Sequence, residues 1–410
     1  MAIARGVAKK VAYKKETAGW PWAPWGELPG PAGAKYLRRV TSDFTLNKET
    51  YESNEIRTDY QVADFRHGVR SAAGTLNGEL SAGSYSDFMA AVVAQDFAAV
   101  SSITPLSITI TAPVSGLQTV VRATGSWITD GVQVGNVIRL SGGTLPIDTT
   151  GVNLLVVDVV ALTLTVRVVN GTTLTTQGSA VTGVTCAIPG KKTFAPTTGH
   201  TNDSFTIEQW FSDISQSEVY TGMKVGSVAM QLPSTGLTTV DISFQGKDLT
   251  STGTTQYFTS PTAASSTGIF AAVNGAVIVN GVPSAVITSA DFTVERGLEA
   301  ANVVGSNNAS DIFTGRIRVN GNISVYFQDA VYRDMFKDET EASIVFALSA
   351  DNSGGADVLS FVMPRVKLGS ASASDSEMGL ITQHSFVALL NTVTTAGLPA
   401  TTIQIQDTSL

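Results

Sequence analysis

Residues able to carry out catalysis or to bind a metal are few and scattered in this sequence. The histidines are His67, His200 and His384, and neither an H-E-x-x-H pattern nor a Cys/His ligand group occurs, which excludes the usual zinc sites. The G-x-S-x-G turn that presents a nucleophilic serine is also missing. The one cysteine, Cys186, fits a buried apolar position better than a reactive thiol. We therefore expect no enzymatic activity, no cofactor and no metal ion.

Two segments resemble ligand-binding loops but lack a required residue. Residues 183–193 include Gly190-Lys191-Lys192, but Lys192 stands where a phosphate-binding loop has Ser or Thr, so we interpret the segment as a basic turn. The run from Asp351 to Asp357 lacks the distal Glu of a calcium loop, and a hairpin turn between two strands explains it. An enzyme with Asp351 and Asp357 as paired carboxylates is one alternative, although nothing in their spacing supports a groove.

Composition indicates a folded chain of two or three domains with many turns. The 410 residues are 43% hydrophobic and 15% charged and include 38 Gly. The net charge of -8 argues against a protein that grips nucleic acid through its phosphates. A single cysteine permits no intrachain disulfide, in agreement with folding in a reducing cytoplasm. Residues 1–16 lack the apolar core of a signal peptide, and residues 154–169 are too short and too often interrupted to span a membrane.

One sequence unit occurs twice. The matching motifs are TSDFT at 41–45 with TSADFT at 288–293, YSDFM at 85–89 with YRDMF at 332–336, MKVGS at 223–227 with VKLGS at 366–370, and SF at 243–244 with SF at 385–386. For the last two motifs, the two copies lie about 100 positions closer together in the sequence than they do for the first two motifs. The first copy therefore contains an insertion that the second lacks, and we place it at residues 101–200.

These motifs divide the chain into domains. The expected parts are an N-terminal arm at 1–36, a discontinuous first domain at 37–100 and 201–248, an inserted small β-domain at 101–200, a polar linker at 249–267, a second domain at 268–400 and a C-terminal tail at 401–410. The insertion has short Val, Ile, Leu and Thr runs separated by Gly and Pro. Since insertions are tolerated on exposed faces, we expect it on the outside of any assembly.

Each copy has the pattern of strands with one buried face, backed by a short helix. In the second copy Ile317, Val319 and Ile323 alternate with polar residues. In the first copy we expect a helix from Ser84, capped by Asp87 three residues later, with Tyr85, Phe88, Met89 and Val92 on its core face. Tyr332, Met335 and Phe336 repeat that stripe. The fold class is all-β with short helices: two tandem β-sandwich or barrel domains plus the inserted domain.

Two segments have the composition of interaction surfaces. The first is the N-terminal arm with Trp20, Trp22 and Trp25 and two intervening prolines, because Trp is common at the energetic centres of interfaces. The arm either docks on a neighbouring subunit or folds back on its own domain. The second is the charged loop 48–66, whose candidate contact residues are Glu49, Tyr51, Glu52, Glu55, Arg57, Asp59, Asp64 and Arg66. A solvated loop is its simplest interpretation, and the matching loop 295–311 is mostly uncharged.

Several motifs resemble the major tail tube proteins of siphophages, which have long non-contractile tails. They are KETYESNEIR at 48–57, DFRHG at 64–68, GELS at 78–81, FTIEQW at 205–210, YTGMKV at 220–225 and EAANVVGS at 299–306. The resemblance covers about three quarters of the chain and omits the arm and most of the insertion. It is carried by both copies of the repeated unit.

The resemblance implies a structural virion protein. Subunits of this family close into rings whose strands form a continuous β-barrel, and the rings stack into a hollow tube through which the genome is ejected. It further implies that loop 48–66 contacts the next ring and that the chain meets the tape measure, distal tail and terminator proteins. DNA would be non-specific cargo, no membrane would be involved, and the protein would be made in the host cytoplasm and reside in the phage tail.

This sequence departs from most members of the family because it carries two tube domains instead of one. We therefore expect three chains in each ring, with pseudo-sixfold symmetry. An acidic lumen would let DNA pass without sticking. The leading alternative is a phage head decoration protein or a surface adhesin, which would share the β-rich composition but would not require the repeated unit. Self-assembly into hollow rods would distinguish the two.

Overall fold

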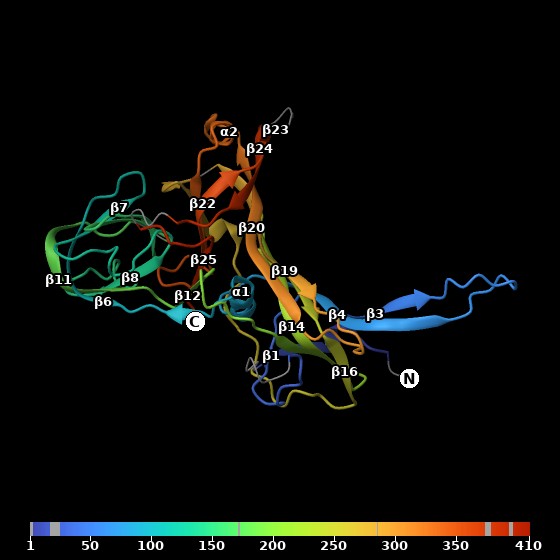
Figure 1. Cartoon of the computed structure of the whole chain (residues 1–410). Coiled ribbons are helices and arrows are strands. Elements are labelled where there is room, and N and C mark those ends of the chain that lie inside the picture. The colour runs from blue at the N-terminus through green and yellow to red at the C-terminus, as the bar shows by residue number, and fades with distance from the viewer. Residues whose placement is uncertain (1–2, 17–24, 171–172, 285, 374–378, 393–396) are drawn as a thin grey trace.

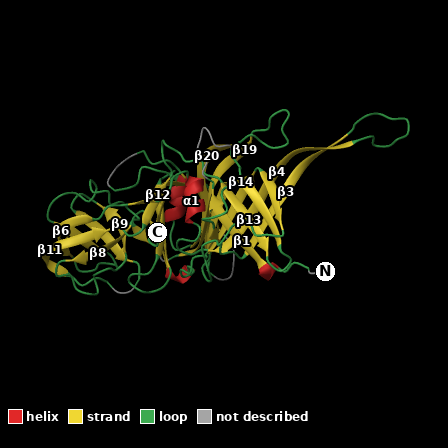
Figure 2. Ribbon diagram, turned by 90° about the horizontal axis from the view of Figure 1, so that it is seen from below, coloured by secondary structure: helices red, strands yellow, loops and turns green. Residues whose placement is uncertain are grey.

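The computed structural model describes residues 3–16, 25–170, 173–284, 286–373, 379–392 and 397–410. In this part of the chain two α-helices accompany a large number of strands (Figure 1; Figure 2). The expected all-β fold with short helices is confirmed. A long β-hairpin projects from one end of the molecule, and a separate barrel lies at the opposite end (Figure 1).

The body between these ends consists of two units with the same order of elements. Repeat 1 comprises η1 (Gly6–Ala8), β1 (Lys9–Lys15), β2 (Lys35–Tyr36), β3 (Thr41–Glu52), β4 (Phe65–Glu79), α1 (Ser86–Val93), β13 (Phe205–Phe211), β14 (Gln216–Leu232), β15 (Thr239–Gly246) and β16 (Asp248–Gly253). Repeat 2 comprises η2 (Ala272–Asn274), β17 (Gly275–Val279), β18 (Val282–Pro283), β19 (Ile287–Ala300), β20 (Ile312–Tyr326), α2 (Val331–Lys337), β21 (Ala342–Ser349), β22 (Val358–Leu368), β23 (Ser372–Ala373) and β24 (Ile381–Ala388).

Strand pairing is the same in both units. In repeat 1 the antiparallel order is β2-β1-β13-β14-β15-β4-β3. In repeat 2 it is β18-β17-β21-β22-β24-β20-β19. The sequence repeat is therefore also a repeat of topology.

A Phe–Gly–Phe row marks the same place in each core. Across three strands Gly74 pairs with Phe44 and Phe244, and Gly321 pairs with Phe292 and Phe386. A Cβ atom at Gly74 would lie 2.1 Å from the Phe44 ring. The glycine therefore makes room for an aromatic ring that packs flat over the strand.

The two repeats join edge to edge into one sheet. β14 pairs with β19 from Ser227↔Glu295 to Leu232↔Ala290, which gives the strand order β3-β4-β15-β14-β19-β20-β24-β23. One hydrophobic cluster runs beneath this sheet and includes Phe44 of repeat 1 and Phe292 of repeat 2. The repeats thus share a core as well as a sheet.

The insertion forms a closed barrel of six strands in the order β10-β7-β6-β11-β8-β9. Its strands are β6 (Ile103–Ile110), β7 (Gln118–Arg122), β8 (Val137–Gly142), β9 (Leu154–Val159), β10 (Thr163–Val168) and β11 (Gln177–Ala187). Although it interrupts repeat 1, its core continues into Val345 and Val362 of repeat 2. β21 is therefore buried on both faces, which explains its unbroken apolar run.

Segments at both ends of the chain belong to the body. Residues expected in an N-terminal arm form β1, where Val11 and Tyr13 are buried. Residues expected in a C-terminal tail form β25 (Gln404–Asp407), which lies between β22 and β12 (Lys191–Phe194). β12 also pairs with β5 (Ala98–Ala99), which follows α1. Both expectations failed because short polar strands carry no local signal of their partners.

The expected linker is also partly structured. Leu249 and Thr250 continue β16, paired with Tyr220 and Val219 of β14, and Phe258 is buried. A Ser/Thr-rich segment is compatible with an edge strand, so composition alone misassigned it. The other domain boundaries drawn from the sequence stay predictions.

The two helices differ from their expected form. α1 begins at Ser86 and not at Ser84, and the carboxylate of Asp87 accepts hydrogen bonds from Tyr13 Oη (2.7 Å) and Lys35 Nζ (3.0 Å) instead of capping the helix. The expected stripe of α1 is buried. None of the residues of α2 is buried, and Phe336 is 40% exposed, so the assignment of Phe336 to the core was wrong.

Candidate assembly surfaces

The charged loop of the sequence analysis is the end of the β3–β4 hairpin, which projects from the body (Figure 1). Glu49, Tyr51 and Glu52 lie at the end of β3, and Arg66 lies at the start of β4 opposite Tyr51. Glu55, Arg57, Asp59 and Asp64 lie in the connecting loop 53–64. We call residues 53–64 the tip.

Side chains at the tip bind one another and not the body. The Arg57 guanidinium donates to Asp59 at 2.9 and 3.0 Å, and Arg66 Nε donates to Asp64 at 2.7 Å. Each guanidinium lowers the pKa of the carboxyl beside it. These ion pairs are solvent-exposed and contribute little to stability. They fix the shape and charge pattern of a surface that is open to a partner.

Apolar side chains accompany these charges. Ile56 and Tyr60 are fully exposed, and Val62 is 67% exposed. A loop that supports no core of its own exposes such residues at a cost, unless another surface covers them. The tip therefore has the mixed apolar and charged character of a contact surface.

In repeat 2 the end of the β19–β20 hairpin is bound to the rest of the chain. Its loop, residues 301–311, accepts a backbone hydrogen bond at Asn307 O from Arg70 N (2.7 Å), at the base of the first hairpin. Asn308 bonds both Arg70 and Asp248, which form an ion pair at 2.9 Å. Lys224, almost fully buried, donates to Asp311 at 2.8 Å. This loop is therefore occupied within the chain.

Of the tryptophans in the N-terminal arm, only Trp25 lies among the described residues, and Trp20 and Trp22 lie outside them. The Trp25 ring packs against Gly222, with the ammonium groups of Lys224 and Lys247 each 5.5 Å from its centre. On the other side of the gap, Glu16 accepts a bond from Gly222 N at 2.7 Å. Both ends of the segment 17–24 are thus anchored on repeat 1. Docking of Trp20 and Trp22 on a neighbour stays a prediction.

The continuous sheet ends in two edges. β3 pairs only with β4, and β23 pairs only with β24, among the described residues. The counterparts of these two edge strands pair with each other inside the chain. β19 is the counterpart of β3, and the second half of β14 is the counterpart of β23 and the residues just before it. Ser227 and Ser243 share a hydroxyl bond, as do Ser370 and Ser385, so the register of the two repeats agrees up to β23.

One face of this sheet is polar from edge to edge. Opposite the core side, the strands present Asp43 and Thr45, Thr75 and Asn77, Asp241 and Ser243, Asp291 and Glu295, Arg318 and Asn320, and Gln383 and Ser385. The amide of Asn322 donates to Asp291 at 3.0 Å, and Glu295 lies across from Arg318. Such a face is suited to contact with water.

In the part of the chain that the structure describes, no arrangement of side chains supports catalysis or metal binding. No group of three His, Cys, Asp or Glu residues could hold a metal ion there. Cys186 is buried, which raises the pKa of its thiol to about 12. Asp351 accepts a bond from Ser353 N at 2.7 Å, as in a hairpin turn. None of the described helices is both long and apolar enough to cross a bilayer.

A comparison with protein families identifies the fold. The model of a family described as phage tail tube protein matches residues 6–393. The chain belongs to this family. A search of curated proteins found no match. The match covers both repeats and the inserted barrel, so membership extends over nearly the whole chain.

As a phage tail tube protein, the chain is a structural component of the virion tail that assembles with copies of itself and meets other tail components. The family role is structural, in agreement with the scattered chemistry of its side chains. Sequence reasoning missed which strands form the two open edges, the ties of Arg70 and Lys224 and the packing of the barrel against β21. The unbroken apolar run of β21 was the one local signal of the last feature, because it indicates a strand covered on both faces.

Proposed function

We propose that three copies of this chain close into a ring with pseudo-sixfold symmetry, and that stacked rings form the hollow tube of a long non-contractile tail through which DNA is ejected. The carrying observation is the junction of β14 with β19 inside the chain. The same junction between β23 of one copy and β3 of the next uses both open edges. Closure of this kind removes edges that would otherwise pair indiscriminately.

The register of the β14–β19 junction inside the chain predicts the register between β23 of one copy and β3 of the next. Ala229 lies opposite Thr293 at the internal junction, and their counterparts are Ser372 and Thr45. Both are exposed. We therefore expect Ser372 of one copy to face Thr45 of the next, with three such contacts in a ring.

A pair of cysteines tests this closure. Thr45→Cys with Ser372→Cys should form a disulfide between copies on oxidation, since paired strands bring Cα atoms within about 6 Å. Each chain then links two neighbours, and the covalent series should end at three chains. Thr41→Cys with Ser372→Cys is the matched control, because Thr41 lies about 13 Å further along the same edge. A series ending at six chains, or electron microscopy averages with true sixfold symmetry, would overturn the proposal.

The polar face is the proposed lining of the lumen. The carboxylates of Asp43, Asp241 and Asp291 would repel the phosphates of passing DNA. Asp241→Lys with Asp291→Lys should leave rods intact but slow ejection in a salt-dependent manner. Lysines at Glu27 and Asp158, which are exposed and outside both this face and the tip, serve as the charge-matched control. Equal ejection by both variants would place the lumen elsewhere.

The remaining parts of the proposal follow from the resemblance and the geometry. The tip would contact the next ring, and the barrel, at the opposite end of the molecule (Figure 2), would lie on the outside of the tube. The tape measure, distal tail and terminator proteins are the partners expected inside and at the ends of the tube. Synthesis would take place in the host cytoplasm.

A further inference from the structure

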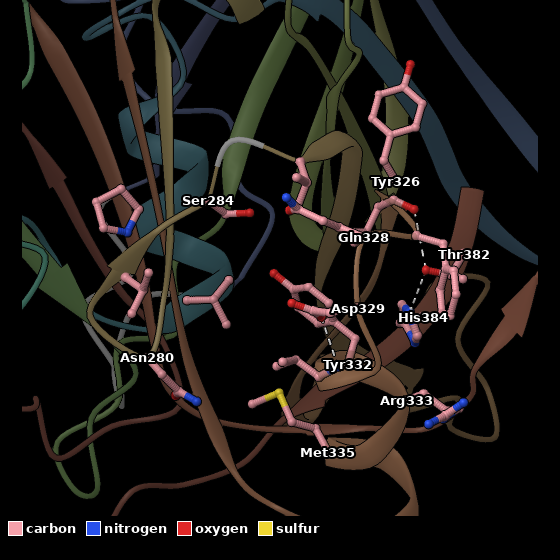
Figure 3. A pocket seen from close by; sticks show the side chains of 17 residues that line it. Asn280, Ser284, Tyr326, Gln328, Asp329, Tyr332, Arg333, Met335, Thr382 and His384 are labelled. Atoms are coloured by element: carbon pink, nitrogen blue, oxygen red, sulfur yellow. Dashed lines mark hydrogen bonds between the residues drawn. The ribbon is translucent and has the colours of Figure 1, made fainter. Parts of the chain in front are cut away.

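The helices of the two repeats cover their sheets to different extents. In α1 all residues except Asp87 are buried. In α2 none is, and a cavity of about 470 Å³ separates it from the sheet. Tyr332, Met335 and His384 line this cavity on one side and Asn280 and Ser284 on the other (Figure 3). We call it the α2 cavity.

In repeat 1 a segment from elsewhere in the chain closes the corresponding place. Phe270, just before η2, is fully buried. Its N–H donates to Leu80 O (2.9 Å) and its carbonyl accepts from Thr238 N (3.0 Å). Its neighbour Ile269 forms a bridge with Ser81. The residues that lead into repeat 2 thus lie across the ends of β4 and β15, beside α1.

The pair of backbone positions that binds the Phe270 segment in repeat 1 recurs in repeat 2, but no such segment lies across it among the described residues. Phe327 N donates to Leu380 O at 2.9 Å, as Leu80 N donates to Thr238 O. Among the described residues no segment crosses this pair. Phe327, Leu380 and Val331 are 46%, 42% and 53% exposed, and they lead from the surface to the α2 cavity. The place is therefore apolar, open and equipped for one more extended segment.

The same strand topology identifies the occupant. η1 precedes β1 as η2 precedes β17, so Ala4 occupies the position of Phe270, Ile3 that of the half-buried Ile269, and Val7 that of Val273. Ile3 is 86% exposed and Val7 is fully exposed. Arg5 N donates to Asp213 at 2.6 Å, which anchors the segment at that residue and leaves Ile3 free to reach a neighbour.

We propose that the segment before β1 of a second copy lies across Phe327 and Leu380, with Ala4 in the position of Phe270 and Ile3 in that of Ile269, beside Phe327, which lines the α2 cavity. This inference rests on the proposed ring, in which repeat 1 of the next copy follows repeat 2 as repeat 2 follows repeat 1 in the chain. Ile3 would then form a bridge with Gln328, the counterpart of Ser81. Each ring junction is in this way closed by a strand pair on one side and by an apolar anchor on the other.

Disulfide formation in assembled tubes tests this contact. Ile3→Cys with Gln328→Cys should link neighbouring copies, with the covalent series ending at three chains, and the unassembled chain should not link. Val7→Cys with Gln328→Cys is the matched control, because the counterpart Val273 is 84% exposed and should not link. Ile3→Glu should raise the protein concentration needed for ring formation at least tenfold, whereas Val7→Glu should leave it unchanged.

The outcomes separate this inference from the proposed ring. If Thr45→Cys with Ser372→Cys closes rings of three while the Ile3 pair stays unlinked, the ring stands and the anchor is wrong. Linkage of Trp22→Cys to Gln328→Cys in place of Ile3→Cys would assign the cavity to the tryptophan arm and also overturn the anchor. Failure of both the Thr45 and the Ile3 pairs would overturn the ring and the anchor together.

Discussion

The β3–β4 and β19–β20 hairpins have the same strand pairing but different ends. The end of the first contacts only itself, through pairs such as Arg57–Asp59. The end of the second is tied to the base of the first by Arg70, Asp248 and Asn308. Duplication thus supplied two copies of one projecting element. One became part of the junction inside the chain, and the other remained available for contact between molecules.

The largest effects should come from replacing the end of each hairpin, residues 53–64 or residues 301–311, with the same two-residue Asn-Gly turn. Replacement of 53–64 should leave folding and ring closure intact but abolish stacking, because the tip is the proposed contact with the next ring. Replacement of 301–311 should lower the free energy of unfolding by about 3 kcal/mol or more, because buried Lys224 loses Asp311. Electron microscopy of particle length and denaturant unfolding measure the two effects. Rods formed without the tip would remove its assigned role.

Glycine substitutions compare the two cores. A Cβ at Gly321 would lie 2.2 Å from the carbonyl oxygen of Asp291, which the backbone cannot avoid. At Gly74 it would meet only the Phe44 ring, which can move. Gly321→Ala should therefore cost about 3 kcal/mol and Gly74→Ala about 1 to 2 kcal/mol. Thermal unfolding of the unassembled chain measures both, and equal costs would contradict the difference in packing.

Two ion pairs of equal length offer a finer comparison. Arg70–Asp248 and Arg57–Asp59 both measure 2.9 Å, but Asp248 is 17% exposed and Asp59 is 43% exposed. Asp248→Ala should lower the free energy of unfolding by about 1 to 2 kcal/mol, because Arg70 and Asn308 lose a shared partner. Asp59→Ala should leave it unchanged, because this pair is exposed to solvent. A larger loss for Asp59→Ala would show that the tip is not independent of the body.

The smallest expected effect is that of mild acid on the tip. Arg57 and Arg66 hold the pKa values of Asp59 and Asp64 below the ordinary 3.8. Their pairs are therefore complete above pH 3.8 and are lost only as pH falls through the lowered values. Light scattering of rods should show no change attributable to these groups between pH 7 and pH 5, and Asp59→Asn with Asp64→Asn should behave like the parent there. A difference between parent and variant in this range would contradict the assignment.

Local sequence signals predicted the elements but not all of their partners. Alternation in β20 and the stripe of Tyr85 and Phe88 in α1 follow from periodicity, which depends on burial of one face. The repeat motifs indicated that the two units share one strand order, because equivalent positions such as Phe44 and Phe292 have equivalent neighbours. The charged tip was recognisable from composition alone.

Long-range pairing could not be predicted in this way. β25 is polar at Gln404, Gln406 and Asp407, yet all three are buried. Gln406 and Asp407 find hydrogen-bond partners in distant parts of the chain. Gln406, for example, bonds Val137 N and O. Likewise, Phe336 repeats the apolar stripe of α1, but nothing in the sequence reveals that its helix stands away from the sheet.

The path of the chain through β5, β12, β25 and β22 has a mechanical consequence. In this small ladder β5 and β12, from the chain between α1 and β13, lie beside β25 and β22, from the C-terminal part of the chain, and Asp407 accepts a bond from Gly83 N at 2.8 Å, next to α1. The two halves are therefore cross-braced within one chain. In the ring proposed above, a subunit whose halves are already fixed relative to each other would lose little further freedom on joining its neighbours, so closure would favour a fixed number of members over an open spiral.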